Sequence, residues 1–334
     1  MEALSENDKS IVEWINFFYG GTSLVFPSLL RSMIRASPGR ELFAADFSKI
    51  EVAVLWWASD NKPGLKILAE GLDPYKYMAA ANKGCDYSEI GDEGDDRQLG
   101  KAQVLGCGFG MGWKRFREAA WETYRLKLTD AQSKDAVKNY RTQNAAVPEV
   151  WKAYEKAAID AVKNPGEIFS AGKCRFKVER DFLWVRLPSG RPLAYAFPQI
   201  SWRMREFEVE ETIIDDDGNE TVITRTETRG PYETLEFYAV NSKTKKWGLE
   251  RTWGGTLCEN VVQAMARDLM ASALLRLEKA GYTALFQVHD EIVCEREIAK
   301  GTIEEFTKIM TLKPKWAAGL PVEAKGWSGP RYKK

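Results

Sequence analysis

The stretch Tyr282-Thr283-Ala284-Leu285-Phe286-Gln287-Val288-His289-Asp290-Glu291-Ile292-Val293-Cys294 decides the fold of this 334-residue chain. Two apolar, β-prone segments flank a short polar centre, which is the pattern of a β-hairpin whose turn lies at the polar residues. That turn would carry two carboxylates, Asp290 and Glu291, beside His289, the single histidine of the sequence. The stretch therefore predicts antiparallel sheet with an acidic site at a hairpin turn.

A second acidic site and a cationic helix precede this hairpin. The segment Asp46-Phe47-Ser48-Lys49-Ile50-Glu51 follows the apolar run 42–45, so Asp46 is expected where a strand ends. Between the two acidic sites, four residues recur at every fourth position of a predicted helix: Arg97, Lys101, Leu105 and Phe109. This spacing places them along one slowly drifting helix face. Carboxylates that share metal ions, together with cations for phosphate, indicate nucleotidyl transfer.

The three segments, in this order, resemble motifs A, B and C of family A DNA polymerases. The matching positions are Asp46 to Glu51 for motif A, Arg97, Lys101, Leu105, Gly106, Phe109 and Gly110 for motif B, and Val288 to Glu291 for motif C. The resemblance covers about residues 25–334. Two further segments favour the bacteriophage or prophage branch: Gly254-Gly255 with Asn260 and Gln263, and Gly326-Trp327 with Arg331-Tyr332.

The resemblance implies an α+β fold, with a palm built on an antiparallel sheet, a helical fingers subdomain and a β-rich insertion. We expect residues 1–63 to hold the N-terminal helices and the first palm strand, and 64–165 to form the fingers. Residues 166–256 would be the β-rich extension, and 257–334 the rest of the palm. Helices are expected at 64–83, 96–120, 129–163 with a break at Pro148, 257–279 and 302–312.

Composition restricts the class of protein. An apolar content of 44% supports a sizeable core, and no apolar run is long enough for a membrane span. Five scattered cysteines without a CxxC pair fit a reduced, cytoplasmic protein, in the bacterial host if the chain is phage-encoded. Lys plus Arg and Asp plus Glu both number 48, so the chain alone is expected to hold DNA weakly.

In the family, the first and third motifs bind two Mg²⁺ ions, and the resemblance assigns this role to Asp46 and Asp290. Hard divalent cations prefer oxygen ligands. The carbonyl of Phe47 would add a ligand, and Glu291 would serve as a secondary ligand or would orient the site. The competing interpretation is that Asp46 only caps the helix that begins near Ser48.

The motif B resemblance assigns the incoming dNTP to the cationic helix. Arg97 and Lys101 would meet the triphosphate, and Lys101 would protonate the leaving pyrophosphate. Leu105 stands where the family usually has Phe or Tyr against the sugar, so poor use of dideoxynucleotides is expected. Phe109 would stack beside the templating base. A solvated basic face is the alternative for this helix.

Other family positions concern selectivity and DNA. Glu51 matches the steric gate that excludes a ribose 2′-OH, against the alternative of an ordinary exposed glutamate. Gln263 and Arg267 would contact the primer-template, with Asn260 assisting. His289 has a family counterpart near the primer terminus, although a lone histidine is more often structural.

A thumb and an exonuclease region have no counterpart in the sequence, because only residues 1–45 precede Asp46. We therefore expect the palm and fingers of a split polymerase, with a separate polypeptide that supplies the missing parts. The alternatives are an expressed fragment of a polymerase and a non-catalytic nucleic-acid-binding subunit or polymerase remnant. An unrelated metal-dependent nuclease is a further rival, but it would not need the helix from Arg97 to Phe109.

Overall fold

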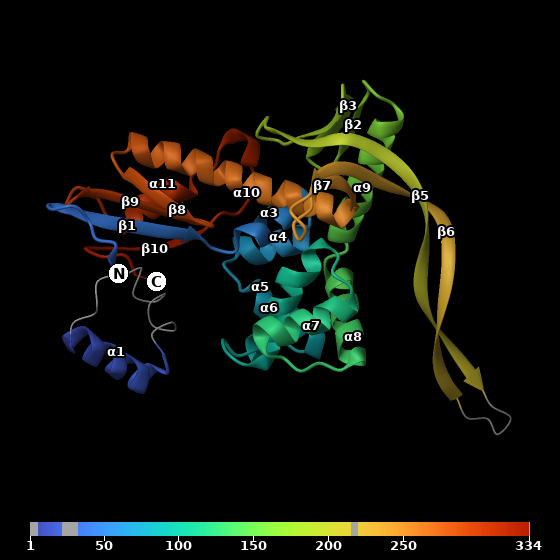
Figure 1. The fold of residues 1–334 in the computed structure, drawn as a ribbon, viewed down its shortest axis with the longest axis horizontal. Coiled ribbons are helices and arrows are strands. Elements are labelled where there is room, and N and C mark those ends of the chain that lie inside the picture. Colours follow the sequence, from blue (N-terminus) through green and yellow to red (C-terminus); the bar gives the residue numbers. More distant parts are fainter. Residues whose placement is uncertain (1–5, 22–32, 215–219, 334) are drawn as a thin grey trace. The chain divides into compact units, whose positions relative to one another are not determined.

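The computed structural model describes residues 6–21, 33–214 and 220–333, and it divides into two compact units. Unit 1 comprises Met1–Ile50, Arg267–Ala318 and Val322–Lys334, and unit 2 comprises Glu51–Ala266 and Gly319–Pro321. Both units combine helices with antiparallel sheet (Figure 1), which confirms the predicted α+β class. Within the described ranges, no helix is both long and apolar enough to cross a membrane.

Unit 1 is built on a four-stranded sheet in the order β10-β1-β9-β8. Its elements are α1 (Glu6–Tyr19), β1 (Arg40–Phe47), β8 (Thr283–Val288), β9 (Glu291–Glu297), α11 (Ile303–Thr311), η3 (Lys315–Ala317) and β10 (Ala324–Gly329), with residues 267–279 of α10 (Gly254–Lys279). The pair β8–β9 is the predicted hairpin, and β1 is the predicted strand before Asp46. Both predictions are confirmed. They could be made because each strand has a strong local apolar pattern.

Buried residues of unit 1 lie on both faces of this sheet, and an aromatic cluster covers one of them. Phe43 of β1 is fully buried, and its ring packs against Tyr282 at 5.1 Å and against Phe306 of α11 at 5.9 Å between ring centroids. Figure 1 shows α11 along the same side of the sheet as α10. Because side chains alternate along a strand, Ala44 and Asp46 project from the opposite face.

The helices of unit 2 are α3 (Ile50–Ala58), α4 (Lys62–Ala69), α5 (Pro74–Lys83), η1 (Tyr87–Glu89), α6 (Asp95–Gly106), η2 (Cys107–Phe109), α7 (Trp113–Tyr124), α8 (Asp130–Gln143) and α9 (Ala146–Lys163). The predicted helix 64–83 is two helices, and the predicted helix 96–120 is interrupted at the glycines 106–112. The predicted break at Pro148 is wrong. Proline is tolerated in the first turn of a helix, where Pro148 lies in α9, so the chain breaks instead at Asn144.

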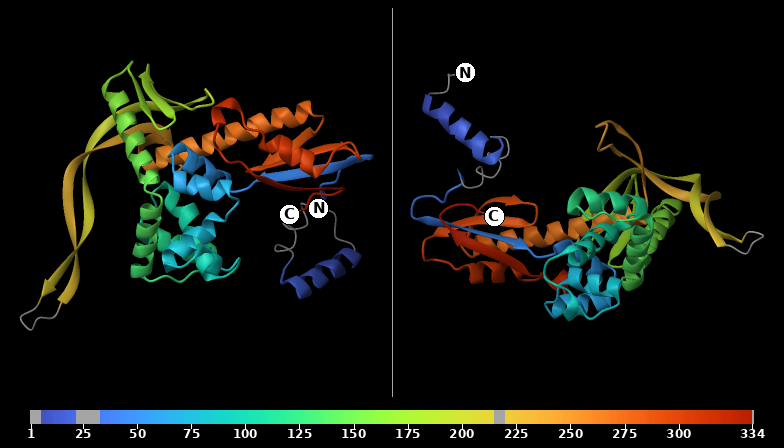
Figure 2. Two further views of the ribbon diagram at one scale, coloured as in Figure 1. Left: turned by 180° about the vertical axis from the view of Figure 1, so that it is seen from behind. Right: turned by 90° about the horizontal axis from the view of Figure 1, so that it is seen from below.

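The six strands of unit 2 form one antiparallel sheet in sequence order. They are β2 (Ile168–Ala171), β3 (Cys174–Glu179), β4 (Phe182–Arg186), β5 (Pro192–Ile214), β6 (Glu220–Val240) and β7 (Trp247–Thr252). From the pair Arg205–Arg229 outward, β5 and β6 pair only with each other, as a two-stranded ribbon that Figure 2 shows from two sides. The predicted turn at 217–219 lies outside the described residues.

The expected division into subdomains at 63, 165 and 256 remains a prediction. Its helical and β-rich segments correspond to α4–α9 and β2–β7, and the long helix predicted before motif C is α10.

The aromatic cluster on the helix-covered face should dominate the stability of unit 1. Replacing Phe43 by Ala removes a fully buried ring and leaves a cavity, so we expect a loss of about 3–5 kcal/mol in the free energy of unfolding. Urea denaturation followed by circular dichroism would measure it. Leu275→Ala is the matched control, because Leu275 is 65% exposed and its loss should change stability by no more than about 0.5 kcal/mol. Equal effects would contradict the packing described.

The reactivity of the five cysteine thiols should show which of them are buried. Burial raises the pKa of Cys107 and Cys294 to about 12 and that of Cys174 to about 11, and it also raises the pKa of Cys258. Only Cys85 is partly exposed. Because the thiolate is the reactive form, titration of the native protein with a disulfide reagent at pH 8 should modify one thiol of five. Denaturant should release the other four, and rapid modification of two or more native thiols would contradict the burial described.

Candidate active site

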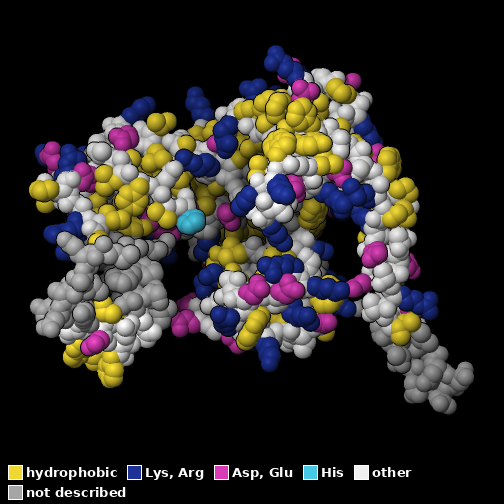
Figure 3. Space-filling view, viewed as in Figure 1, with side chains coloured by type: hydrophobic (Ala, Val, Ile, Leu, Met, Phe, Trp, Pro, Cys, Tyr) yellow, Lys and Arg dark blue, Asp and Glu magenta, His cyan; other side chains and the backbone are white. Residues whose placement is uncertain are grey.

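The β8–β9 hairpin places Asp290 in a two-residue turn. Val288 pairs with Glu291 across the hairpin, which leaves His289 and Asp290 as the turn residues. His289 has a positive φ of 54°, as tight hairpin turns require, and histidine is one of the residue types that tolerate this conformation. Its side chain is exposed, and Figure 3 shows it at the surface in cyan.

Strand β1 brings the second carboxylate to the same place. Asp46 lies opposite Glu291 in the antiparallel register of β1 and β9, and the N–H of Phe47 donates a hydrogen bond of 3.2 Å to the carbonyl of Asp290. Asp46 and Asp290 therefore stand at adjacent strand ends. Both are partly exposed, so their carboxylates are accessible to a ligand.

Glu291 has a different environment from Asp290. Its side chain is only 3% exposed, and its carboxylate accepts a short hydrogen bond from the hydroxyl of Tyr332. Tyr332 is itself buried, and its ring contacts Phe286 and Trp327 on the face of the sheet that carries Asp46. This arrangement favours the orienting role of Glu291 over that of a metal ligand.

The two accessible carboxylates fit a metal that arrives with its substrate. Among the described residues, no three His, Cys, Asp or Glu side chains converge on one point. Mg²⁺ characteristically uses one or two protein carboxylates and completes its shell with water and substrate phosphates. The carboxylates of Asp46 and Asp290 match this pattern. They do not make up the protein ligand set of a resident structural ion.

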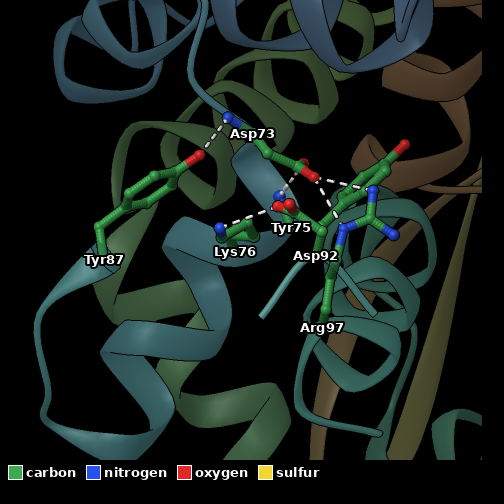
Figure 4. Close-up of polar contacts among 6 residues, drawn as sticks. All are labelled: Asp73, Tyr75, Lys76, Tyr87, Asp92 and Arg97. Carbon is green, nitrogen blue, oxygen red and sulfur yellow. Dashed lines mark hydrogen bonds and ion pairs between the residues drawn. The ribbon is translucent and has the colours of Figure 1, made fainter. Parts of the chain in front are cut away.

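In unit 2, the guanidinium of Arg97 is held in place by Asp73. Nε and Nη2 of Arg97 lie 2.9 and 2.8 Å from Oδ2 of Asp73, and the group also lies over the ring of Tyr75 at 5.5 Å (Figure 4). The other oxygen of Asp73 caps α5 by accepting the N–H of Tyr75. One carboxylate thus fixes both the start of α5 and the position of Arg97 on α6.

Tyr75 interacts with two of the predicted nucleotide-binding residues of unit 2, Arg97 and Glu51. Burial and the charge of Asp73 raise the pKa of Tyr75 to about 12, and the charge of Glu51 contributes in the same direction. Lys101 lies over the ring of Tyr124 at 5.9 Å, and Tyr124 also acts on the pKa of Tyr75. Arg97 and Glu51 therefore act on the same tyrosine, and Lys101 lies over the neighbouring Tyr124.

Helix α6 and the following turn place the remaining motif B residues on separate sides. Leu105 is part of a small cavity, about 150 Å³ in volume, against α7. Phe109 ends η2, outside α6, and Gly110 follows with a positive φ of 87°. A side chain at Gly110 would overlap Trp253, so this glycine is required by packing. Gly106 has no such close neighbour.

The predicted DNA-binding residues of α10 differ in their availability. Gln263 and Arg267 are exposed and one turn apart on the helix. Asn260 is partly buried, and its amide donates a hydrogen bond of 3.0 Å to the hydroxyl of Tyr195. Asn260 therefore holds β5 against α10, while Gln263 and Arg267 point to solvent.

Three residues of these sites were not predicted from the sequence: Asp73, Tyr75 and Tyr332. Asp73-Pro74 carries a helix-start signal, an N-cap followed by proline at N1, but nothing in that signal indicates an arginine partner. Tyr332 belongs to the C-terminal segment already associated with phage relatives. Its contact with Glu291 spans 41 residues of sequence and was not visible in any local pattern.

The chain has a relative by sequence and a similar solved structure. No protein-family model matches the chain. It is 32% identical over 322 residues to a protein named DNA polymerase of Bacillus phage SP02, an alignment that covers 96% of this chain and 46% of that protein. The chain thus spans about half the length of this relative.

A solved structure shows a similar fold. The POL domain of Pol1 from M. smegmatis, in complex with DNA primer-template and dNTP, matches with a TM-score of 0.56 at 16% identity, over 90% of this chain and 42% of that one. The fold is that of a polymerase domain, and the sequence is related to a phage DNA polymerase along nearly all of its length. The expected resemblance to a phage DNA polymerase is confirmed, and the assignment to family A stays a prediction.

Removing the hydroxyl of Tyr332 should show how much its hydrogen bond to Glu291 contributes to stability. In Tyr332→Phe the buried carboxylate loses a charge-assisted hydrogen bond, so we expect stability to fall by about 1.5–3 kcal/mol. Thermal unfolding would measure the change. Tyr238→Phe serves as control, because that ring is 37% exposed and should tolerate the change. Equal melting temperatures for all three proteins would contradict the buried contact.

Proposed function

We propose that this chain carries the nucleotidyl-transfer site of a family A-type DNA polymerase and performs template-directed synthesis from dNTPs on a primer 3′-OH. The observation that carries the proposal is the placement of Asp46 and Asp290 at adjacent strand ends, in a chain related to a phage DNA polymerase. A non-catalytic DNA-binding subunit would have no need for two accessible carboxylates side by side.

In this proposal Asp46 and Asp290 hold two Mg²⁺ ions, with the carbonyl of Phe47 as a further ligand. When bound, such ions supply Lewis-acid activation of the attacking hydroxyl and stabilise the charge that develops in the displacement. Asp46 and Asp290 position the cations, while Glu291 fixes the hairpin through Tyr332.

The cations of unit 2 would bind the triphosphate of an incoming dNTP. Arg97 is already oriented by Asp73, which lowers the conformational cost of phosphate binding. Lys101, which is partly exposed on the same helix, would donate the proton to the pyrophosphate. Glu51 would exclude the ribose 2′-OH, Leu105 would contact the sugar, and Phe109 would stack beside the templating base.

Primer-template contacts would come from exposed polar side chains. Gln263 and Arg267 on α10 and His289 at the hairpin turn are accessible for this role. Asn260 would act indirectly, because its amide is bound to Tyr195. We further propose that synthesis requires regions outside the aligned half of the relative, such as a thumb, on the same or on a separate polypeptide.

Primer extension tests the proposal. With Mg²⁺, dNTPs and a polypeptide that supplies the regions outside this chain, at low salt, Asp290→Asn should lose extension by at least about a hundredfold relative to wild type, because the variant lacks a charge that positions the metal. Glu297→Gln, an exposed position at the far end of β9, is the matched control and should extend normally. Retained extension in Asp290→Asn would contradict the assignment.

Sugar selectivity tests the role of Glu51 separately. Glu51→Ala removes the side chain proposed to fill the 2′ position, so ribonucleotide incorporation should rise at least about tenfold, while dNTP incorporation changes less. The ratio of kcat/KM for rNTP and dNTP is the measurement. Glu93→Ala, an exposed acid of the same unit, should leave the ratio unchanged. An unchanged ratio in Glu51→Ala would assign Glu51 to the ordinary helix surface.

A further inference from the structure

The six-stranded sheet of unit 2 has a cavity on the face opposite to α9. Helix α9 covers the other face, where the ring of Tyr154 contacts that of Phe176 at 5.5 Å between centroids. This sheet-face pocket is about 470 Å³ in volume, which is in the range of ligand sites. Three neighbouring strands supply most of its lining: Ile168 of β2, Arg175, Lys177 and Glu179 of β3, and Trp184 and Arg186 of β4.

The strand register sets the side chains at the pocket in two adjacent rows across β2, β3 and β4: Ile168–Lys177–Trp184 and Ser170–Arg175–Arg186. The rows are two residues apart along each strand, so both present their side chains to the same face of the sheet. Ile168 is 61% exposed, and Trp184 is partly exposed. The pocket therefore combines accessible apolar surface with a pair of arginines.

Arg175 and Arg186 give the pocket a net positive charge. They lie directly opposite each other in the register of β3 and β4, and both are exposed. In the described part of the chain, neither guanidinium has an acidic partner, and the one acid of the lining, Glu179, is bound by Lys177 at 2.9 Å. Like charges directly opposite each other destabilise a strand pair, so this arrangement favours an anionic ligand over a structural role.

Strand β2 adds a backbone element to the pocket. It stands first in the order of the sheet, so its outer edge has no neighbouring strand among the described residues. Edge strands of native proteins often carry charges or prolines that prevent further pairing, but β2 reads Ile168-Phe169-Ser170-Ala171. Because the pairing of backbone groups alternates along an antiparallel strand, every second residue of β2 directs its N–H and C=O away from β3.

We propose that β2 and the sheet-face pocket together bind an extended acidic peptide of a partner protein. The peptide would pair with the outer edge of β2 and place a large apolar side chain beside Ile168 and Trp184. A carboxylate of the peptide would bind the guanidiniums of Arg175 and Arg186. Side chains two residues apart in the added strand face the pocket, so the recognised sequence has an acidic residue two positions from a large apolar one.

Single-stranded nucleic acid is the competing anion. Its phosphates could bind the same arginines, but it has no strand edge that could pair with β2. The open edge beside the pocket therefore favours the peptide.

The test selects its own probe, by panning a yeast-displayed library of random twelve-residue peptides on the immobilised chain. Enriched peptides should carry an acidic residue two positions from a large apolar residue. A fluorescein-labelled copy of the most enriched peptide should bind Arg175→Glu/Arg186→Glu at least about tenfold more weakly than wild type in fluorescence anisotropy, because charge-assisted contacts become repulsive.

The control variant Lys243→Glu/Lys246→Glu has the same charge change at the exposed turn between β6 and β7, and it should bind the peptide as wild type does. Circular dichroism would establish that both variants are folded. Binding of the peptide to wild type should also slow hydrogen–deuterium exchange in residues 168–171, because an added strand protects the amides at the edge of β2.

The proposal would be overturned by a selection that enriches no acidic peptide, by equal affinity of the two variants, or by unchanged exchange in residues 168–171. An oligonucleotide of twelve thymidines that binds wild type more tightly than the peptide does, and that loses affinity in Arg175→Glu/Arg186→Glu, would assign the pocket to nucleic acid instead. None of these measurements depends on primer extension, so a failure of the proposed activity leaves their outcome unchanged.

Discussion

The pairing of β1 with β9 is the constraint on which the candidate site depends. Its register sets Asp46 opposite Glu291 and joins the backbone of Phe47 to that of Asp290. A shift of one residue would turn Asp46 toward the aromatic core around Phe43 and remove the site. The buried packing of Phe43 with Phe306 and Tyr282 therefore stabilises the register as well as the fold.

Local patterns in the sequence predict the elements that carry the site. The apolar run before Asp46 and the two β-prone segments around His289 correspond to β1, β8 and β9, because alternation and turn chemistry are local properties. Contacts between distant segments were not predictable in this way. The bond from Tyr332 to Glu291 and the capture of Arg97 by Asp73 join residues 41 and 24 positions apart.

The ends of the helices were likewise not fully predictable from local sequence patterns. The interruption at Gly106–Gly112 follows from the positive φ of Gly110 and its packing against Trp253, a residue far along the chain. Pro148, by contrast, lies in the first turn of α9, where proline is tolerated, so it does not break the helix.

The central claim is that Asp46 and Asp290 hold divalent cations together with a nucleotide. Electron paramagnetic resonance of Mn²⁺, titrated with and without dNTP, measures this directly, because Mn²⁺ prefers the same oxygen donors as Mg²⁺. Wild type should bind Mn²⁺ at least about tenfold more tightly when dNTP is present, and Asp46→Asn/Asp290→Asn should lose that increase while Glu297→Gln keeps it. If dNTP still tightened Mn²⁺ binding in the double variant as it does in wild type, the assignment of the cations to Asp46 and Asp290 would be wrong.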